Sequence, residues 1–298
     1  MKRFFLLGLI VVFCFSIFVG SGAQNAEASD VGSGAYRVTK QWETKPELRI
    51  PESVLYDDAR NILYVSNING KSTEKNGQGF ISKVSLDGKI TVLQWVTGLN
   101  APKGSALYKD KLYVSDIDHL VEIDLNTGTI LANHPAPGAQ FLNDVAADPE
   151  GNVYVSDMSP ENSAIYQLRQ GRMTVWMKGP EISRPNGLSI EGTRLLVGNS
   201  GDGTLKAISL ADKKISTIVQ VGSGIDGLRP DGKGNYFISD WQGKTSLVTA
   251  SGTIIVLVDT TAFKINAADL EYIPGTRFLL IPTFFNNRVM AYTVGETP

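Results

Sequence analysis

The sequence predicts an all-β protein, a six-bladed β-propeller with four antiparallel strands in each blade. Three observations support this fold. A strand–turn–strand unit recurs six times, further strands follow each unit, and the last unit lacks a fourth strand that the N-terminal segment can supply. A repeat of roughly 40 to 50 residues with four strands is typical of propeller blades.

The N-terminal residues predict a secretory signal peptide. Two basic residues precede an apolar run, 4–19, and two small-residue sites follow it, ending at Ala23 and Ala28. This order of segments is typical of export signals. We expect residues 1–28 to be removed and the protein to be secreted or periplasmic. An uncleaved anchor is the alternative, because the run is nearly long enough to cross a bilayer.

Residues 29–298 are expected to form one domain, the propeller. Each repeating unit consists of two short apolar strands joined by a turn rich in Asp, Gly, Asn and Pro, which favour tight turns. The units span 51–67, 102–116, 141–157, 185–199, 225–240 and 267–282.

Further strands complete the blades. A third strand follows every unit, and a fourth follows the first five. The sixth unit ends with its third strand, 288–294, so we expect residues 35–43 to pair with it. Pairing the two ends closes the ring and leaves no free sheet edge. A closed ring needs no partner chain, and a monomer is expected.

Composition excludes some classes of protein. The chain has 28 Lys and Arg against 30 Asp and Glu, so it lacks the basic excess of a nucleic-acid-binding protein. Its single cysteine, Cys14, lies in the predicted signal and excludes a disulfide scaffold. We expect no nucleic-acid partner and, after signal cleavage, no membrane partner.

The innermost strands predict a ring of side chains around the axis. The equivalent positions in the six units, 40 to 51 residues apart, are Glu52, Lys103, Asn143, Asn186, Asp226 and Ala268. Two carboxylates and two carboxamides without His or Cys suit Ca²⁺; Mg²⁺ or Mn²⁺ is possible. Each residue alone indicates only a turn or a solvated charge. The shared phase of four oxygen-bearing residues favours a metal site.

A second set of polar residues ends the second strand of each unit. We expect these side chains to cap loops and bind backbone groups rather than a ligand. They are Asn67, Asp116, Asp157, Asn199 and Asp240.

These motifs resemble the gluconolactonase and regucalcin (senescence marker protein) family. The similarity lies in Pro51-Glu52-Ser53, Leu142-Asn143-Asp144, 184–188 and 224–228, and the repeat covers about residues 35–295. It implies that the four oxygen donors, Glu52, Asn143, Asn186 and Asp226, hold a divalent cation, usually calcium. It also implies that Asp226 is the catalytic base or nucleophile. The implied substrate is a small molecule, a sugar lactone or related ester, or sometimes a phosphotriester.

Three residues depart from the family pattern, and these departures concern the sugar substrate more than the metal site. Lys103 replaces a neutral polar residue, Ala268 stands where some relatives have His, and Phe141 stands where lactonases often have Arg for the sugar. Lys103 would weaken cation binding by repulsion or, as a catalytic residue, stabilise an oxyanion; a surface lysine is the alternative. His119 is a candidate helper in the cup.

Two functions follow. The first is metal-assisted hydrolysis of a lactone or ester, or of a phosphotriester at the same site, with Asp226 as base. The second is a secreted, non-catalytic propeller that binds a ligand or a protein, because the fold alone does not make an enzyme.

Overall fold

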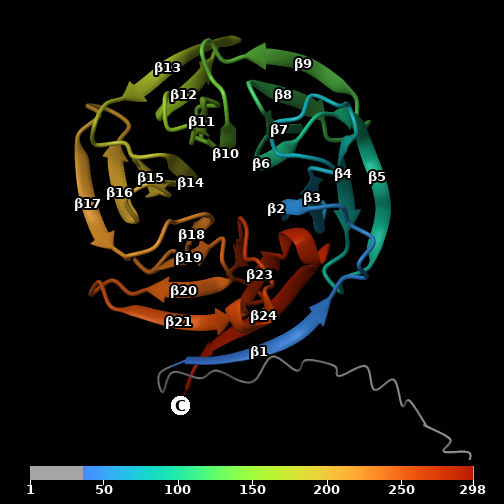
Figure 1. The fold of residues 1–298 in the computed structure, drawn as a ribbon, viewed down its shortest axis with the longest axis vertical. Coiled ribbons are helices and arrows are strands. Elements are labelled where there is room, and N and C mark those ends of the chain that lie inside the picture. Colours follow the sequence, from blue (N-terminus) through green and yellow to red (C-terminus); the bar gives the residue numbers. More distant parts are fainter. Residues whose placement is uncertain (1–35, 298) are drawn as a thin grey trace, which may run out of the picture.

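The computed structural model describes residues 36–297 and confirms the six-bladed propeller, with six four-stranded sheets around a central axis (Figure 1). The predicted signal peptide, residues 1–28, lies outside the described residues. Blade 1 contains β2 (Pro51–Asp57), β3 (Ile62–Asn67), β4 (Gly79–Val84) and β5 (Ile90–Leu99). Blade 2 contains β6 (Pro102–Tyr108), β7 (Lys111–Asp116), β8 (His119–Asp124) and β9 (Ile130–Pro135). Blade 3 contains β10 (Leu142–Ala147), β11 (Val153–Asp157), β12 (Ala164–Arg169) and β13 (Arg172–Lys178).

The second half of the ring follows the same pattern. Blade 4 contains β14 (Pro185–Glu191), β15 (Arg194–Asn199), β16 (Thr204–Ser209) and β17 (Ile215–Gln220). Blade 5 contains β18 (Leu228–Pro230), β19 (Tyr236–Asp240), β20 (Lys244–Val248) and β21 (Ile254–Asp259). Blade 6 contains β22 (Glu271–Ile273), β23 (Phe278–Pro282), β24 (Val289–Glu296) and β1 (Tyr36–Glu43). The described chain also has two short 3₁₀ turns, η1 (Thr261–Phe263) and η2 (Phe284–Asn286).

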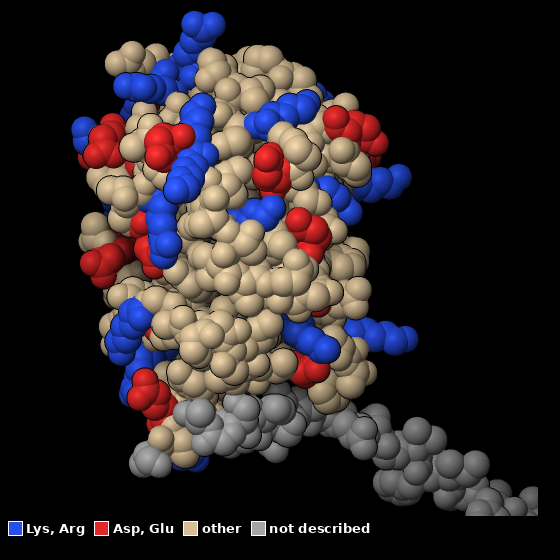
Figure 2. Space-filling view, turned by 90° about the vertical axis from the view of Figure 1, so that its left-hand side faces the viewer, with Lys and Arg blue, Asp and Glu red and all other residues tan. Residues whose placement is uncertain are grey.

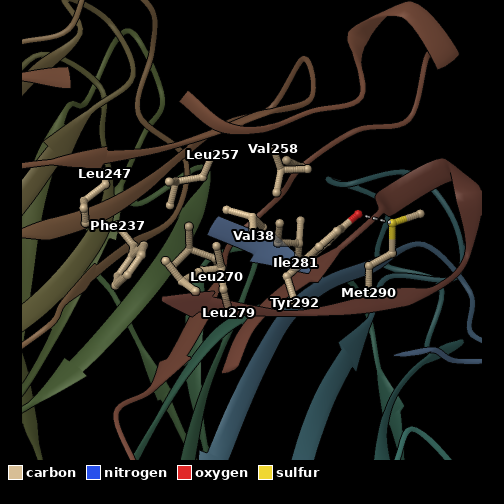
Figure 3. Packing of buried hydrophobic residues seen from close by; sticks show 12 residues of the cluster. Val38, Phe237, Leu247, Leu257, Val258, Leu270, Leu279, Ile281, Met290 and Tyr292 are labelled. Atoms are coloured by element: carbon tan, nitrogen blue, oxygen red, sulfur yellow. Dashed lines mark hydrogen bonds between the residues drawn. The ribbon is translucent and has the colours of Figure 1, made fainter. Parts of the chain in front are cut away.

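The N-terminal strand closes the ring, as predicted. β1 pairs antiparallel with β24 from Tyr36 opposite Glu296 to Glu43 opposite Met290. In Figure 1 the blue β1 lies beside the red β24 at the outer rim. Figure 3 shows the apolar core at this closure, where Val38 of β1 lies among side chains of blades 5 and 6 such as Leu257. Burial of this core is the main favourable term that holds the two ends together.

The innermost strands of neighbouring blades approach one another closely. A Cβ added to Gly104 would lie 2.3 Å from an Asp144 carboxylate oxygen. One added to Gly187 would lie 2.5 Å from the carbonyl oxygen of Asp226. Neither distance is possible for a real side chain, so glycine is required where neighbouring inner strands meet.

The second set of polar residues caps backbone groups, as predicted. The side-chain oxygens of Asn67, Asp116, Asp157 and Asn199 each accept a hydrogen bond from a backbone N–H of the connection that enters their own blade, at 2.8 to 3.1 Å. Asp240 instead accepts the backbone N–H of Gln242 in the adjoining turn at 2.8 Å. These side chains fix the loops between blades.

The outer side of the propeller carries mixed charge. Figure 2 shows Lys and Arg interspersed with Asp and Glu over this face. Within residues 36–297, no helix is both long and apolar enough to cross a membrane.

Candidate active site

The predicted ring lines one cavity. Glu52, Lys103, Asn143, Asn186 and Asp226 all contribute to its wall, and its volume is about 370 Å³. Ala268 is fully buried and packs with Ile68 and Phe284 beside the cavity instead of lining it. The structure therefore brings the four predicted oxygen donors and Lys103 to the same place.

Serine side chains hold the backbone of the ring. The hydroxyl of Ser156 in blade 3 donates to the carbonyl oxygen of Asn186 in blade 4 at 2.8 Å. Ser115 in blade 2 donates in the same way to Asn143 in blade 3, and Ser239 in blade 5 to Ala268 in blade 6 at 2.6 Å. Sequence reasoning missed this role, although each serine directly precedes a capping Asp. The contact recurs and sets the spacing between neighbouring ring positions.

The two ring carboxylates are buried, and neighbouring negative charge disfavours their ionised forms. Burial, and next the charge of Asp226, hold the pKa of Glu52 well above its ordinary value. Burial, and next the charge of Asp269, raise the pKa of Asp226 to about 7. One oxygen of Glu52, Oε2, is buried without a hydrogen-bond partner among the described residues. A buried carboxylate oxygen without a partner is costly and indicates that a proton, a water or an ion belongs there.

The two ring amides direct their N–H groups away from one another. Asn186 Nδ2 donates to Asp226 Oδ1 at 3.0 Å, and Asn143 Nδ2 lies 2.9 Å from the sulfur of Met158. Within the part of the chain that the structure describes, neither amide oxygen accepts a hydrogen bond from a side chain or backbone group. Both oxygens are thus available to a ligand in the cavity.

Lys103 is a buried residue of the cavity wall, so the surface alternative is wrong. Its side chain is among the largest fully buried ones, and Nζ donates to the carbonyl oxygen of Ala101 at 3.0 Å. Nζ also lies 4.7 Å from the ring centre of Phe141, in cation–π geometry. Burial lowers the pKa of Lys103 to about 8, although the charge of Glu52 opposes this shift.

His119 does not contribute to the cavity wall. Its Nδ1 lies 3.1 Å from Asp118 Oδ1, and its Nε2 lies 3.7 Å from the capping carboxylate of Asp116. The expectation that it assists in the cup is therefore wrong.

A buried charge cluster next to the ring was not predicted. Arg229 of β18 lies among three carboxylates, with its nitrogens 3.8 Å from Asp144 Oδ2, 3.6 Å from Asp269 Oδ2 and 3.4 Å from Glu271 Oε1. Asp144 also accepts the backbone N–H of Leu188 at 2.7 Å, and Asp269 accepts the hydroxyl of Ser53 at 2.8 Å. Contacts of this cluster therefore join blades 3, 4, 5, 6 and 1 around the axis.

The charges of the ring and the cluster do not balance. Five buried carboxyl groups, Glu52, Asp144, Asp226, Asp269 and Glu271, face two buried cations, Lys103 and Arg229. The pKa of each carboxyl is raised, first by burial. A divalent cation would offset most of the excess negative charge, and hard oxygen donors are the ligands that calcium prefers. The residues present therefore fit such an ion.

The fit depends on the amides as much as on the acids. The described residues contain no group of three or more His, Cys, Asp or Glu side chains placed to hold a metal. A cation in this cavity would need Asn143 and Asn186 in addition to Glu52 and Asp226. Carbonyl oxygens of amides are ordinary ligands for calcium and poor ones for structural zinc.

The repeat and the ring agree with a known family. A family model described as SMP-30/Gluconolactonase/LRE-like region matches residues 50–268. The chain belongs to this family. The match includes all six ring positions and ends at the last of them, Ala268. No curated protein sequence matches the chain.

Solved structures show how widely the fold of this SMP-30/gluconolactonase-like protein is shared. A gluconolactonase from Xanthomonas campestris is 15% identical with a TM-score of 0.63, covering 87% of this chain and 90% of that one. A calcium-binding regucalcin from Agrobacterium tumefaciens is 16% identical with a TM-score of 0.62, covering 84% and 91%. A virginiamycin B lyase from Staphylococcus aureus is 12% identical with a TM-score of 0.63, covering 87% and 99%. At these identities the similarity establishes the fold, and the activity has to be argued from the cavity.

Proposed function

We propose that this family member is a hydrolase that opens a lactone or a related ester in the cavity at the axis. The observation that carries the proposal is the ring itself: two carboxylates and two amides line one cavity, and among the described residues neither the amide oxygens nor Glu52 Oε2 have a hydrogen-bond partner. The family and its gluconolactonase relatives support this reaction class.

Glu52, Asn143, Asn186 and Asp226 would hold the cation, which we propose to be calcium. When bound, a divalent cation polarises a carbonyl oxygen as a Lewis acid. The calcium-binding relative of the same fold supports this choice of metal.

Three side chains of the protein would position the water, transfer its proton and stabilise the oxyanion. Asn186 holds Asp226 Oδ1 at 3.0 Å and leaves the other carboxylate oxygen for a water. Asp226 as general base takes the proton of that water as it attacks the carbonyl carbon. With a pKa of about 8, Lys103 is mainly an ammonium at neutral pH and can donate a hydrogen bond to the oxyanion. Ring opening then requires a proton on the leaving oxygen, which Asp226 can return.

The test of the proposal is activity that depends on the metal. Mature protein treated with a chelator is expected to lose turnover of simple lactones and to regain it with Ca²⁺. Turnover that survives complete removal of metal would contradict it. Comparison with a phosphotriester under the same conditions identifies the favoured substrate.

One observation favours a second function, binding without catalysis. The charge of buried Lys103 opposes the upward shift of the pKa of Glu52 and would compete with a cation. A cavity in which the charge of Lys103 takes the place of a cation would bind a ligand and take up no metal. Metal analysis of the purified protein separates the two functions.

We also propose that the protein is exported through the predicted signal peptide.

Cation binding is expected to depend on pH. Without metal, Asp226 is protonated below its pKa of about 7 and ionised above it, so an ion that binds at lower pH must displace a proton. Affinity for Ca²⁺ should therefore fall about tenfold per pH unit below that value for each displaced proton. Calorimetry in two buffers of different ionisation enthalpy measures the proton release. Equal affinity from about pH 5 to pH 8 would contradict the assignment of Asp226 as a ligand.

A further inference from the structure

The mouth of the cavity is largely aromatic on one side. Trp241, Phe284 and Phe285 line it together with Ile68 and Phe141. Trp241 follows β19 in blade 5, whereas Phe284 and Phe285 belong to η2 in blade 6. Their ring centres lie 5.6 Å (Trp241–Phe284), 4.8 Å (Phe284–Phe285) and 6.1 Å (Trp241–Phe285) apart, each pair edge to face. We call these three side chains the aromatic rim.

Much of the aromatic rim is exposed. Trp241 is 43% and Phe285 62% exposed, although both border a cavity. Large aromatic side chains gain most from burial, and their exposure around a hollow is typical of a surface that a ligand covers. A cavity of about 370 Å³ is large enough for a small molecule.

The loop that carries two side chains of the rim, Phe284 and Phe285, is held in place by hydrogen bonds. Phe284 has φ of 48°, in the left-handed region that an aromatic residue avoids. Thr283 Oγ1 donates to the carbonyl oxygen of Arg288 at 2.9 Å, and Asn287 Oδ1 accepts the backbone N–H of Ile50 at 2.9 Å. Strained backbone that the surrounding contacts hold in place is concentrated at functional sites.

The rim offers a sugar few partners. A polyhydroxylated ring needs a donor or acceptor for each hydroxyl that it buries, and an unpaired hydroxyl costs affinity. Apart from the ring residues, the polar lining of the cavity consists of Ser72, Arg184 and Ser200. The side formed by Trp241, Phe284 and Phe285 provides only the indole N–H as a polar group.

We propose that the cavity takes lactones or esters that carry an aryl group or an extended alkyl chain, and that the aromatic rim binds this apolar part. The inference rests on the proposed function and specifies its substrate class. The reacting carbonyl lies at the ring of oxygen donors, and the apolar substituent lies against Trp241 and Phe285.

The test compares three lactones and three variants. For the wild type, kcat/KM for γ-decanolactone should exceed that for γ-butyrolactone and for glucono-δ-lactone by about tenfold or more. Trp241→Ser and Phe285→Ser should each lower kcat/KM for γ-decanolactone by about tenfold and leave γ-butyrolactone unchanged. Phe263→Ser is the matched control, because Phe263 is 52% exposed and does not line the cavity. Phe263→Ser should not change kcat/KM for either substrate.

Two results would overturn the inference. One is a higher kcat/KM for glucono-δ-lactone than for γ-decanolactone. The other is a loss in the rim variants no larger than that in Phe263→Ser.

A binding experiment separates this inference from the proposed hydrolysis. Calorimetric titration with 3-hexylcyclopentanone, in which a CH₂ group replaces the ring oxygen of γ-decanolactone so that no ester bond can be cleaved, tests the apolar site alone. Binding that is lost in Phe285→Ser and kept in Phe263→Ser sustains the site even where no lactone is turned over, so that only the hydrolase assignment fails. Absence of binding to the wild type would overturn the inference.

Discussion

Asp226→Asn is expected to abolish hydrolysis and leave the propeller folded. The substitution keeps the shape of the side chain but removes the proposed base and the negative charge of one proposed ligand. Loss of a general base alone lowers kcat by about 10²- to 10⁴-fold, and loss of the ligand adds to this. Steady-state kinetics on a simple lactone with saturating Ca²⁺ measure the effect.

The direction in which Asp226→Asn changes the stability of the metal-free protein is also predicted. Burial raises the pKa of Asp226 to about 7, so in the metal-free protein the folded state holds a proton that the unfolded state releases at lower pH. The free energy of unfolding therefore falls as the pH rises from the ordinary pKa of an aspartate to about 7, and the loss is complete above that value. Metal-free Asp226→Asn should melt at the same temperature as metal-free wild type or higher.

The control for the loss of activity is Asp231→Asn, at a turn of the same blade outside this cavity, which should keep full activity. Substantial turnover by Asp226→Asn would exclude it as base.

Arg229→Met is expected to destabilise the fold more than other single changes at charged residues. Methionine retains much of the length of the side chain but leaves Asp144, Asp269 and Glu271 without their shared cation. Removal of one partner from a buried ion pair costs about 3–5 kcal/mol, because the remaining charge stays desolvated. Urea denaturation monitored by circular dichroism measures the change in the free energy of unfolding.

The pH dependence of the destabilisation by Arg229→Met distinguishes the loss of a charge interaction from the loss of packing. Burial raises the pKa of all three carboxyl groups, so acid neutralises them and the cost of Arg229→Met should shrink as the pH falls. A cost that is independent of pH would indicate lost packing instead. Arg194→Met is the matched control, since Arg194 pairs with Glu191 at the surface and its side chain is 41% exposed. Its loss should cost at most about 1 kcal/mol.

The sequence predicts those features that recur with the repeat. The ring residues, the capping residues and the closing strand all have a fixed phase relative to the strand–turn–strand unit. For this reason Asn143, Asp157 and residues 35–43 could be placed without a structure.

Features that break the repeat could not be predicted in the same way. Arg229 meets carboxylates that are about 40 or 85 residues away in sequence, and its own position in the unit has no equivalent basic residue nearby. Asp144 and Asp269 do share a phase, one residue after the ring position, and this was the available signal for the cluster. The aromatic rim lies in loops of different length, where the position of a residue relative to the repeat does not predict its place in the structure.

The proposed hydrolysis depends on one divalent cation bound at the axis by oxygen donors from four blades. Calorimetric titration of metal-free mature protein with Ca²⁺ tests this directly. The wild type is expected to take up one ion per chain at the cavity, and Glu52→Gln is expected to lose this uptake. No detectable uptake by the wild type, or unchanged uptake by Glu52→Gln, would contradict it.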